Sequence, residues 1–341
     1  MKINKIERNK KQGHPHFLVK LFMFLFILFL LDFAIGSILK TLYFTQNSGL
    51  LYRTTYALDS TKADILIFGA SKANHHYYPD AFEKKLNMSC YNAGRDGYDI
   101  FYHYAILQGV LKRYSPKIVI LDFARVEFFR NQDSYDRLSS LLPYYNEHPE
   151  MRSIIQLKSP YEKYKLLSKI YPYNSLIFTI AMGNTKLNKS RRNNNDDNGY
   201  IPLTKIWKEQ IITDTSFKKY DLDSNKIKLF KSFVTDCIHS NAKLYIFISP
   251  YFKNFKFEDP SVLIAEEFTK KYNIPFYDFS NDSLFLNNAG LFYDPIHLND
   301  RGAKIYSNIV IDKIMQDQLN NESPAIKDSL LPLNNYSIIK K

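Results

Sequence analysis

The hydrophobic pattern begins with one long apolar stretch near the N-terminus. Every residue from Leu21 to Leu31 is apolar, and after Asp32 the stretch continues to Leu39. A helix of this length rises about 28 Å, close to the roughly 30 Å thickness of a bilayer's hydrocarbon core. We therefore predict a transmembrane helix at residues 21–39. A cleaved signal peptide and a buried core helix are the alternatives, although no convincing small-residue cleavage site follows the stretch.

The rest of the chain alternates short apolar runs with segments of helical spacing. The runs predict strands at 65–68, 89–92, 117–123, 244–249 and 275–279, and the spacing predicts helices at 79–86, 100–114, 227–240, 265–272 and 305–319. Continuous apolar strands separated by helices are typical of a parallel sheet that is covered on both faces. The sequence therefore predicts an α/β fold.

The same pattern divides the chain into segments. We expect a basic segment at 1–20, the transmembrane helix at 21–39, a linker at 45–62, an α/β domain at 63–319 and a flexible tail at 320–341. Within the domain, residues 124–226 break the alternation of strands and helices. They are rich in Tyr, Lys and Asn, and we interpret them as a mostly helical insertion with a solvated loop around 191–195.

Composition narrows the class of protein. The chain has 341 residues, of which 45% are hydrophobic and 23% are charged, so a disordered protein is excluded. Two Cys residues exclude a disulfide framework and any Cys-rich zinc module. Cys90 falls on a predicted strand and Cys237 on a predicted helix, and they are either a disulfide or two separate buried thiols.

The formal net charge of +12 is concentrated in two places. Residues 1–20 carry a net +5, which predicts a cytoplasmic N-terminus and an extracytoplasmic domain. Residues 151–220 carry a net +8. This charge could bind an anionic glycan or lipid headgroups, or it is simply a soluble lysine-rich surface. The remainder is nearly neutral, so no nucleic-acid partner is expected. Asp32 is expected near the bilayer's outer interface or against a partner membrane protein.

Candidate chemistry lies where predicted strands end, the edge at which open α/β sheets bind ligands. Ser71 follows the first strand. At this position its hydroxyl can meet a substrate, and nearby backbone N–H groups can hold an oxyanion. The alternative is that the serine only forms a turn or caps a helix. Residues 92–97 follow the second strand and contain two glycines. Before the last helix, Asp294 stands three residues ahead of His297, a spacing that lets the carboxylate orient the imidazole as it deprotonates a serine.

Together these stretches resemble the SGNH/GDSL hydrolase family, in order, from Asp64 to about Ile311 and skipping the insertion. Gly69-Ala70-Ser71 is similar to the family's first block, 92–97 to its second and 293–299 to its fifth. The resemblance implies a three-layer, flavodoxin-like parallel sheet and a catalytic triad of Ser71, His297 and Asp294. It also implies an oxyanion hole formed by the backbone amides of Ser71 and Gly97, with no cofactor and no metal.

The third block departs from the family. The family has an Asn after the third strand whose side chain donates to the oxyanion, but here the chain reads Phe123-Ala124-Arg125. Arg125 and Asn74 are candidate replacements, and Asn92 is a further possible pocket residue. The resemblance implies a membrane-anchored esterase or O-acyltransferase acting on acylated cell-surface carbohydrate. The missing Asn keeps open an alternative, an inactive glycan-binding or assembly accessory protein.

Other polar residues near these stretches have two interpretations each. His75 and His76 suggest a metal ligand pair, but adjacent His residues point apart, and we interpret them as surface or pocket-rim residues. Asp96 and Asp99 are interpreted as solvated loop charges. The tyrosines near the candidate loops either stack on sugar rings or pack in the core, and they are Tyr77, Tyr78, Tyr98 and Tyr102.

Overall fold

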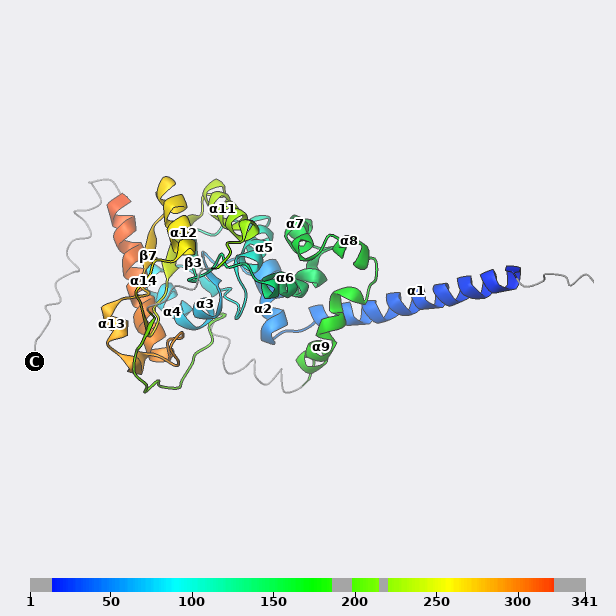
Figure 1. Cartoon of the computed structure of the whole chain (residues 1–341), viewed down its shortest axis with the longest axis horizontal. Helices are drawn as coiled ribbons and strands as arrows, with labels where there is room; N and C mark the ends of the chain where they lie inside the picture. Colours follow the sequence, from blue (N-terminus) through cyan, green and yellow to red (C-terminus); the bar gives the residue numbers. More distant parts are fainter. Residues whose placement is uncertain (1–13, 186–197, 215–219, 322–341) are drawn as a thin grey trace, which may run out of the picture.

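The computed structural model describes residues 14–185, 198–214 and 220–321. It contains a mixed α/β domain from which the N-terminal part of one long helix, α1 (His14–Phe44), projects (Figure 1). This helix is the one described helix long and apolar enough to cross a membrane, and its side chains from Phe17 to Leu31 are exposed. It extends beyond the predicted range of 21–39 at both ends.

The domain is built on a parallel sheet of five strands. Their bounds are β1 (Ile65–Gly69), β2 (Cys90–Asn92), β3 (Ile118–Asp122), β5 (Lys243–Ile248) and β7 (Phe276–Asp278), and their order across the sheet is β2-β1-β3-β5-β7. The central strands β1 and β3 are buried along their whole length, as continuous apolar runs require. The predicted parallel sheet is confirmed.

Helices cover both faces of this sheet because alternate strand residues enter two separate cores. In β1, Leu66 and Phe68 belong to one core, whereas Ile65 and Ile67 belong to the other. The first core is covered by α2 (Gly49–Asp59), α5 (Ile100–Leu111), α11 (Ser224–His239) and α12 (Pro260–Lys271). The second is covered by α3 (Ser71–His76), α4 (Pro79–Leu86), α13 (Ser283–Leu286) and α14 (Asp300–Asn321).

The predicted linker at 45–62 contains a helix that the sequence pattern does not predict. Most of it forms α2, whose Leu51 and Leu58 are buried in the first core. The polar and apolar residues of this short stretch have no clear period along the sequence. Its helical structure depends on packing against α5, which a linear pattern does not reveal.

The insertion between β3 and α11 consists of short helices and turns up to residue 185. It contains α6 (Gln132–Arg137), α7 (Arg152–Ile155), α8 (Glu162–Lys165) and α9 (Ile177–Gly183), with 3-10 turns η1 (Leu138–Tyr144), η2 (Pro149–Met151), η3 (Gln156–Lys158) and η4 (Tyr171–Leu176) between them. Its last part pairs β4 (Ile212–Asp214) in parallel with β6 (Lys253–Phe255), a small sheet that the sequence did not predict. The predicted solvated loop at 191–195 and most of the predicted tail lie outside the described residues.

Cys90 and Cys237 are separate buried thiols. Cys90 lies in the core under α3 and α14, and Cys237 lies in the core on the opposite face of the sheet. The sheet separates them, and of the two alternatives the free thiols are observed.

The sheet order places a topological switch point beside β1. From β1 the chain first adds β2 on one side and then crosses to add β3 on the other. In open α/β sheets, the loops that leave neighbouring strands in opposite directions open a crevice at this point. Ser71 begins α3 directly after β1 and therefore lies at this crevice.

Candidate active site

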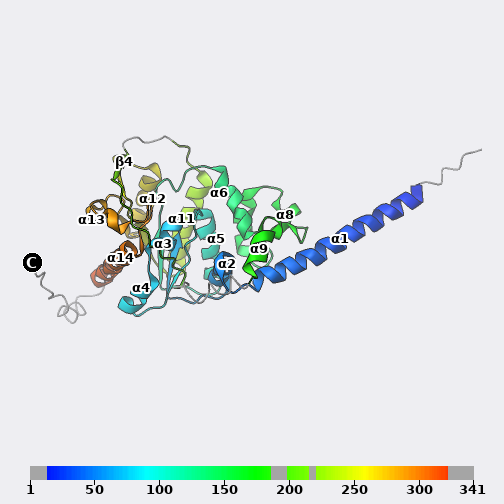
Figure 2. The same ribbon diagram turned by 90° about the horizontal axis from the view of Figure 1, so that it is seen from below.

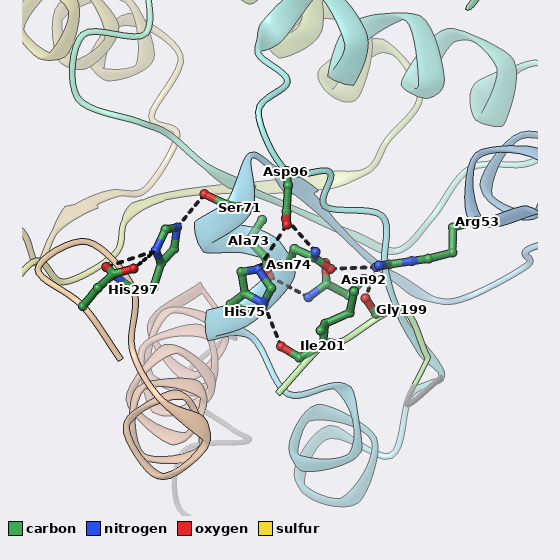
Figure 3. A network of polar contacts seen from close by, with 11 residues as sticks. Arg53, Ser71, Ala73, Asn74, His75, Asn92, Asp96, Gly199, Ile201 and His297 are labelled. Carbon is green, nitrogen blue, oxygen red and sulfur yellow. Dashed lines mark hydrogen bonds and ion pairs between the residues drawn. The ribbon is translucent and has the colours of Figure 1, made fainter. Parts of the chain in front are cut away.

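Three segments far apart in sequence meet at the carboxyl edge of the sheet. Ser71 begins α3, the loop 93–99 follows β2, and the segment 292–299 precedes α14. These three segments carry the residues that the sequence predicted as a site. Figure 3 shows them around the short helix α3.

Ser71, His297 and Asp294 form a continuous chain of hydrogen bonds. The Ser71 hydroxyl donates to His297 Nε2, with Oγ and Nε2 2.8 Å apart (Figure 3). On the other side of the ring, His297 Nδ1 donates to Asp294 Oδ2 at 2.9 Å. This is the arrangement in which an imidazole can take a proton from a serine while a carboxylate fixes its tautomer. The structure thus brings together the three residues that the sequence singled out.

The Asp294 carboxylate is held by its own loop. Its Oδ1 accepts backbone N–H groups from Ile296 at 2.7 Å and from His297 at 2.9 Å. Burial raises the pKa of Asp294, but the hydrogen bonds from His297 and from the loop amides outweigh burial and hold the pKa below its usual value. Asp294 is therefore ionised at neutral pH, as a partner for an imidazolium must be.

His76 forms a hydrogen bond with the backbone of the loop that carries His297. Its Nε2 accepts the backbone N–H of Leu298 at 2.9 Å, so Nδ1 carries the proton and donates to Ser249 Oγ at 3.1 Å. Burial holds the pKa of His76 well below its usual value, and the charge of Lys72 lowers it further. The interpretation of His76 as a surface or pocket-rim residue is wrong, because its side chain is fully buried between α3 and this loop.

A second polar network borders the site on the side of β2. Asn74 Nδ2 donates to Asp96 Oδ1 at 2.7 Å, and His75 Nε2 lies 3.3 Å from Asp96 Oδ2 (Figure 3). Arg53 of α2 donates to Asn74 Oδ1 at 2.8 Å. Although burial raises the pKa of Asp96, the hydrogen bonds from His75 and Asn74 lower it to about 2. Asp96 is half-exposed, but it is part of this network rather than a free loop charge.

Residues near the end of the insertion form hydrogen bonds with segments on both sides of the site. The N–H of Ile201 donates to the Asn74 carbonyl at 3.1 Å, and His75 Nδ1 donates to the Ile201 carbonyl at 2.7 Å. Farther along, the N–H of Trp207 donates to the Phe292 carbonyl at 2.8 Å. Residues 201–207 therefore connect α3 to the loop that carries His297. Nothing in the sequence indicated this contact, because it depends on backbone groups.

Asn92 and Asn74 use their amide groups internally. Asn92 Nδ2 donates to the carbonyls of Ala73 and Tyr77, and its Oδ1 accepts the N–H of Gly94. Asn92 thus fixes α3 against the loop 93–99. The Asn74 amide is likewise occupied, because its Nδ2 is bound to Asp96 and its Oδ1 to Arg53.

Arg125 is directed to another part of the domain. Its guanidinium carbon lies 4.2 Å from the centre of the Phe255 ring, and its nitrogens donate to the Phe257 carbonyl and to Ser280 Oγ. These contacts join the loop after β3 to the region of β6 and α12. The sequence hypothesis that Arg125 replaces the family's Asn is not favoured by this geometry.

A different arginine lies against the predicted oxyanion glycine. Gly97 has a φ of +76°, which favours glycine, and a Cβ built at this position would lie 2.9 Å from Arg137 NH1. Arg137 is the last residue of α6 in the insertion, and its side chain is exposed. No sequence motif indicates this contact, because 40 residues separate the two positions.

A buried pair of charges lies next to Ser71. Lys72 is 3% exposed, and its Nζ lies 3.8 Å from the centre of the Tyr251 ring with no hydrogen-bond partner among the described residues. Asp122, at the end of β3, accepts hydrogen bonds from Tyr77 and from the N–H of Ser249. Burial raises the pKa of Asp122, partly offset by the charge of Lys72. The site therefore has a cation beneath it that the sequence analysis did not single out.

The remaining candidates near the loops have mainly structural contacts. Asp99 accepts the N–H of Phe101 at the start of α5 and pairs with Lys226 at 2.8 Å, so its interpretation as a solvated charge is wrong. Tyr77 and Tyr102 are buried and pack in the core. Tyr78 and Tyr98 are partly exposed, which leaves these two available to a ligand.

Comparison with protein-family models and with curated proteins finds no match for this chain. Within residues 14–185, 198–214 and 220–321, no three His, Cys, Asp or Glu side chains gather as a metal site would require.

Proposed function

We propose that this protein is a membrane-anchored, extracytoplasmic serine esterase or O-acyltransferase of SGNH type. Its substrate is an ester, in our proposal the acyl group of a cell-surface carbohydrate. The observation that carries the proposal is the hydrogen-bonded chain Ser71–His297–Asp294 at the switch point of a parallel sheet. Its strand order matches the flavodoxin-like order, which supports the three-layer fold that the family resemblance implies.

The proposed reaction begins at the serine. Ser71 Oγ attacks the ester carbonyl while His297 Nε2 takes the hydroxyl proton, and Asp294 stabilises the resulting imidazolium. The tetrahedral intermediate collapses to an acyl-serine, and His297 returns the proton to the leaving alkoxide. Water then yields hydrolysis, whereas a sugar hydroxyl yields acyl transfer, with His297 again acting as the base.

Negative charge develops on the carbonyl oxygen during attack, and three groups are available to stabilise it. In the proposal, the backbone amides of Ser71 and Gly97 hold the oxyanion. Arg137, which contacts Gly97 from the insertion, supplies the donor that the family takes from its third-block Asn. The guanidinium of Arg137 adds a full positive charge beside the amides.

The experiment uses the full chain in detergent micelles or nanodiscs. Hydrolysis of p-nitrophenyl acetate and labelling by a fluorophosphonate probe are measured for the parent protein, Ser71→Ala and His297→Ala, with Ser283→Ala, an exposed serine on α13, as the matched control. The proposal expects loss of activity in the first two variants only and labelling confined to Ser71.

The absence of an Asn after β3 favours one second candidate, a catalytically inactive glycan-binding or assembly accessory protein. In that case Ser71→Ala and the parent chain give the same rate, the fluorophosphonate does not label Ser71, and binding to glycan is retained.

A further inference from the structure

The insertion contacts α1 at a position that lies well before the end of the helix's apolar surface. Asp32 accepts hydrogen bonds from the Ser168 hydroxyl and from the backbone N–H groups of Lys169, at 2.7 Å, and Ile170, at 3.3 Å. One turn later Gly36 faces Lys169, and a Cβ at position 36 would collide with the Lys169 backbone. The contact is therefore close and specific.

The length of α1 fixes the depth of this contact. A helix needs about 20 residues to cross the roughly 30 Å hydrocarbon core. Counted from Lys20, such a crossing ends at Lys40, where polar residues return and Lys40 pairs with Glu147. Asp32 lies eight residues before Lys40, or about 12 Å along the helix axis. If the membrane ended at Asp32 instead, residues 21–31 would span only about 16 Å, which is too short.

The part of the insertion that reaches this depth has an apolar outer surface. Between residues 161 and 182, Phe178 is 79% exposed and Leu167 is 78% exposed. Further exposed apolar or aromatic side chains in the same stretch are Tyr161, Tyr164, Ile177 and Met182. Side chains of this kind are costly in water when they gather on one surface, and they mark a contact with an apolar phase or a partner.

The buried carboxylate of this stretch is neutralised, as burial away from water requires. The buried Glu162 is paired with Lys165 at 2.9 Å and accepts the hydroxyl of Tyr171 at 2.7 Å. Lys163 and Lys169 are exposed, which suits the phosphate level of a bilayer. Figure 2 shows α9 beside the domain-proximal part of α1, and η4 also packs against this helix, so this surface adjoins the exposed surface of α1.

We propose that residues 161–182 form a membrane-embedded platform that enters the leaflet on the domain's side of the bilayer together with α1. Phe178 and Leu167 contact acyl chains. Asp32 lies below the phosphate level, where the platform supplies the hydrogen bonds that its carboxylate accepts. The occupant of this surface is lipid, because the platform lies at the depth where α1 itself is in lipid. This proposal depends on α1 spanning the membrane, and not on the esterase proposal.

The test measures immersion depth in the full chain reconstituted in vesicles of phosphatidylcholine and phosphatidylglycerol. Single cysteines are introduced by Phe178→Cys and Leu167→Cys and spin-labelled, with Leu263→Cys on α12 as a matched exposed control. Both native thiols are buried, so labelling is selective. Collision with oxygen, which partitions into lipid, is compared with collision with a water-soluble nickel chelate.

A higher ratio of oxygen to nickel collisions at 178 and 167 than at 263 supports the platform. A ratio equal to that of Leu263→Cys means that the surface faces water and overturns the proposal. Low collision with both reagents means that a protein partner or a second copy of the chain covers the surface, which also overturns it. Circular dichroism of each variant, matched to that of the parent, verifies the fold, and none of these outcomes depends on the outcome for Ser71.

Discussion

His76 accepts a hydrogen bond from the backbone N–H of Leu298, the residue that directly follows His297. His76 lies on the same short helix as Ser71, so this contact ties the proposed nucleophile's helix to the loop of the proposed base. The 2.8 Å separation of Ser71 Oγ and His297 Nε2 thus depends on a side chain that itself touches neither atom.

We predict that His76→Phe lowers both stability and catalytic rate. The change leaves the Leu298 N–H buried without an acceptor, which costs about 1–3 kcal/mol, and it releases the loop that orients His297. Urea unfolding and p-nitrophenyl acetate hydrolysis measure the two effects. His239→Phe, at an exposed position near the end of α11, is the control and leaves both unchanged. Full activity in His76→Phe would contradict the positioning role.

Asp294→Asn is expected to reduce the rate by about 10³- to 10⁴-fold while the protein stays folded, by analogy with the Asp-to-Asn change in a serine protease triad. The amide cannot stabilise the imidazolium and favours the wrong tautomer of His297. Steady-state kinetics with p-nitrophenyl acetate gives the ratio. Asp312→Asn, which changes an exposed carboxylate paired with Lys85, is the matched control. A loss below tenfold in Asp294→Asn would argue against the triad.

Arg137→Gln is expected to lower kcat by up to about 10²-fold with little change in KM, as removal of one oxyanion donor does. Arg137→Lys keeps the charge and loses the fork of donors, so it should recover part of the loss. Arg130→Gln, also exposed and in the same insertion, serves as the control. An effect on KM alone would assign Arg137 to substrate binding instead of the oxyanion.

The protein should lose stability as the pH falls from about 6.5 towards 4. Burial lowers the pKa of His103 to about 4, only partly opposed by Asp99, and the pKa of His76 is also well below its usual value. In this window the unfolded chain binds protons at these histidines and the native protein does not. The free energy of unfolding therefore falls by about 1.4 kcal/mol per pH unit for each histidine.

Urea unfolding of the full chain in micelles at pH 7.5, 6.0 and 5.0 measures this slope. His103→Gln removes one titrating group and should flatten the dependence by about one histidine's share. Parallel curves for the two proteins would show that His103 does not account for the slope.

The sheet could be predicted from the sequence because its strands are buried on both faces. Runs such as Ile118–Asp122 stand out against the amphipathic helices around them, whatever the rest of the chain does. Ser71, Asp294 and His297 could be named for a related reason. In a parallel sheet the carboxyl ends of the strands share one edge, so residues far apart in sequence converge there.

The parts that could not be predicted depend on long-range contacts of residues with ordinary local patterns. The sequence predicts His76 at the surface or the pocket rim, because neighbouring histidines on a helix point apart. In fact α14 and the loop before it cover one of them completely. Arg137 lies on a six-residue helix with no distinctive motif, and only the packing of the insertion brings it to Gly97. The helix α2 was missed because its stability comes from α5.

The connection between α1 and the domain is short and is not a flexible hinge. Only residues 45–48 separate α1 from α2, and Gln46 and Ser48 within them are buried, while Asp32 is bound to the insertion. A domain on a flexible linker samples many heights and orientations above a surface. In this protein the contacts between α1 and the domain hold the domain in one position relative to the helix. The crevice therefore faces one direction at one height. Under the proposed esterase function, the ester that reaches Ser71 is therefore presented at that height, by a molecule that is itself attached to the membrane or extends from it.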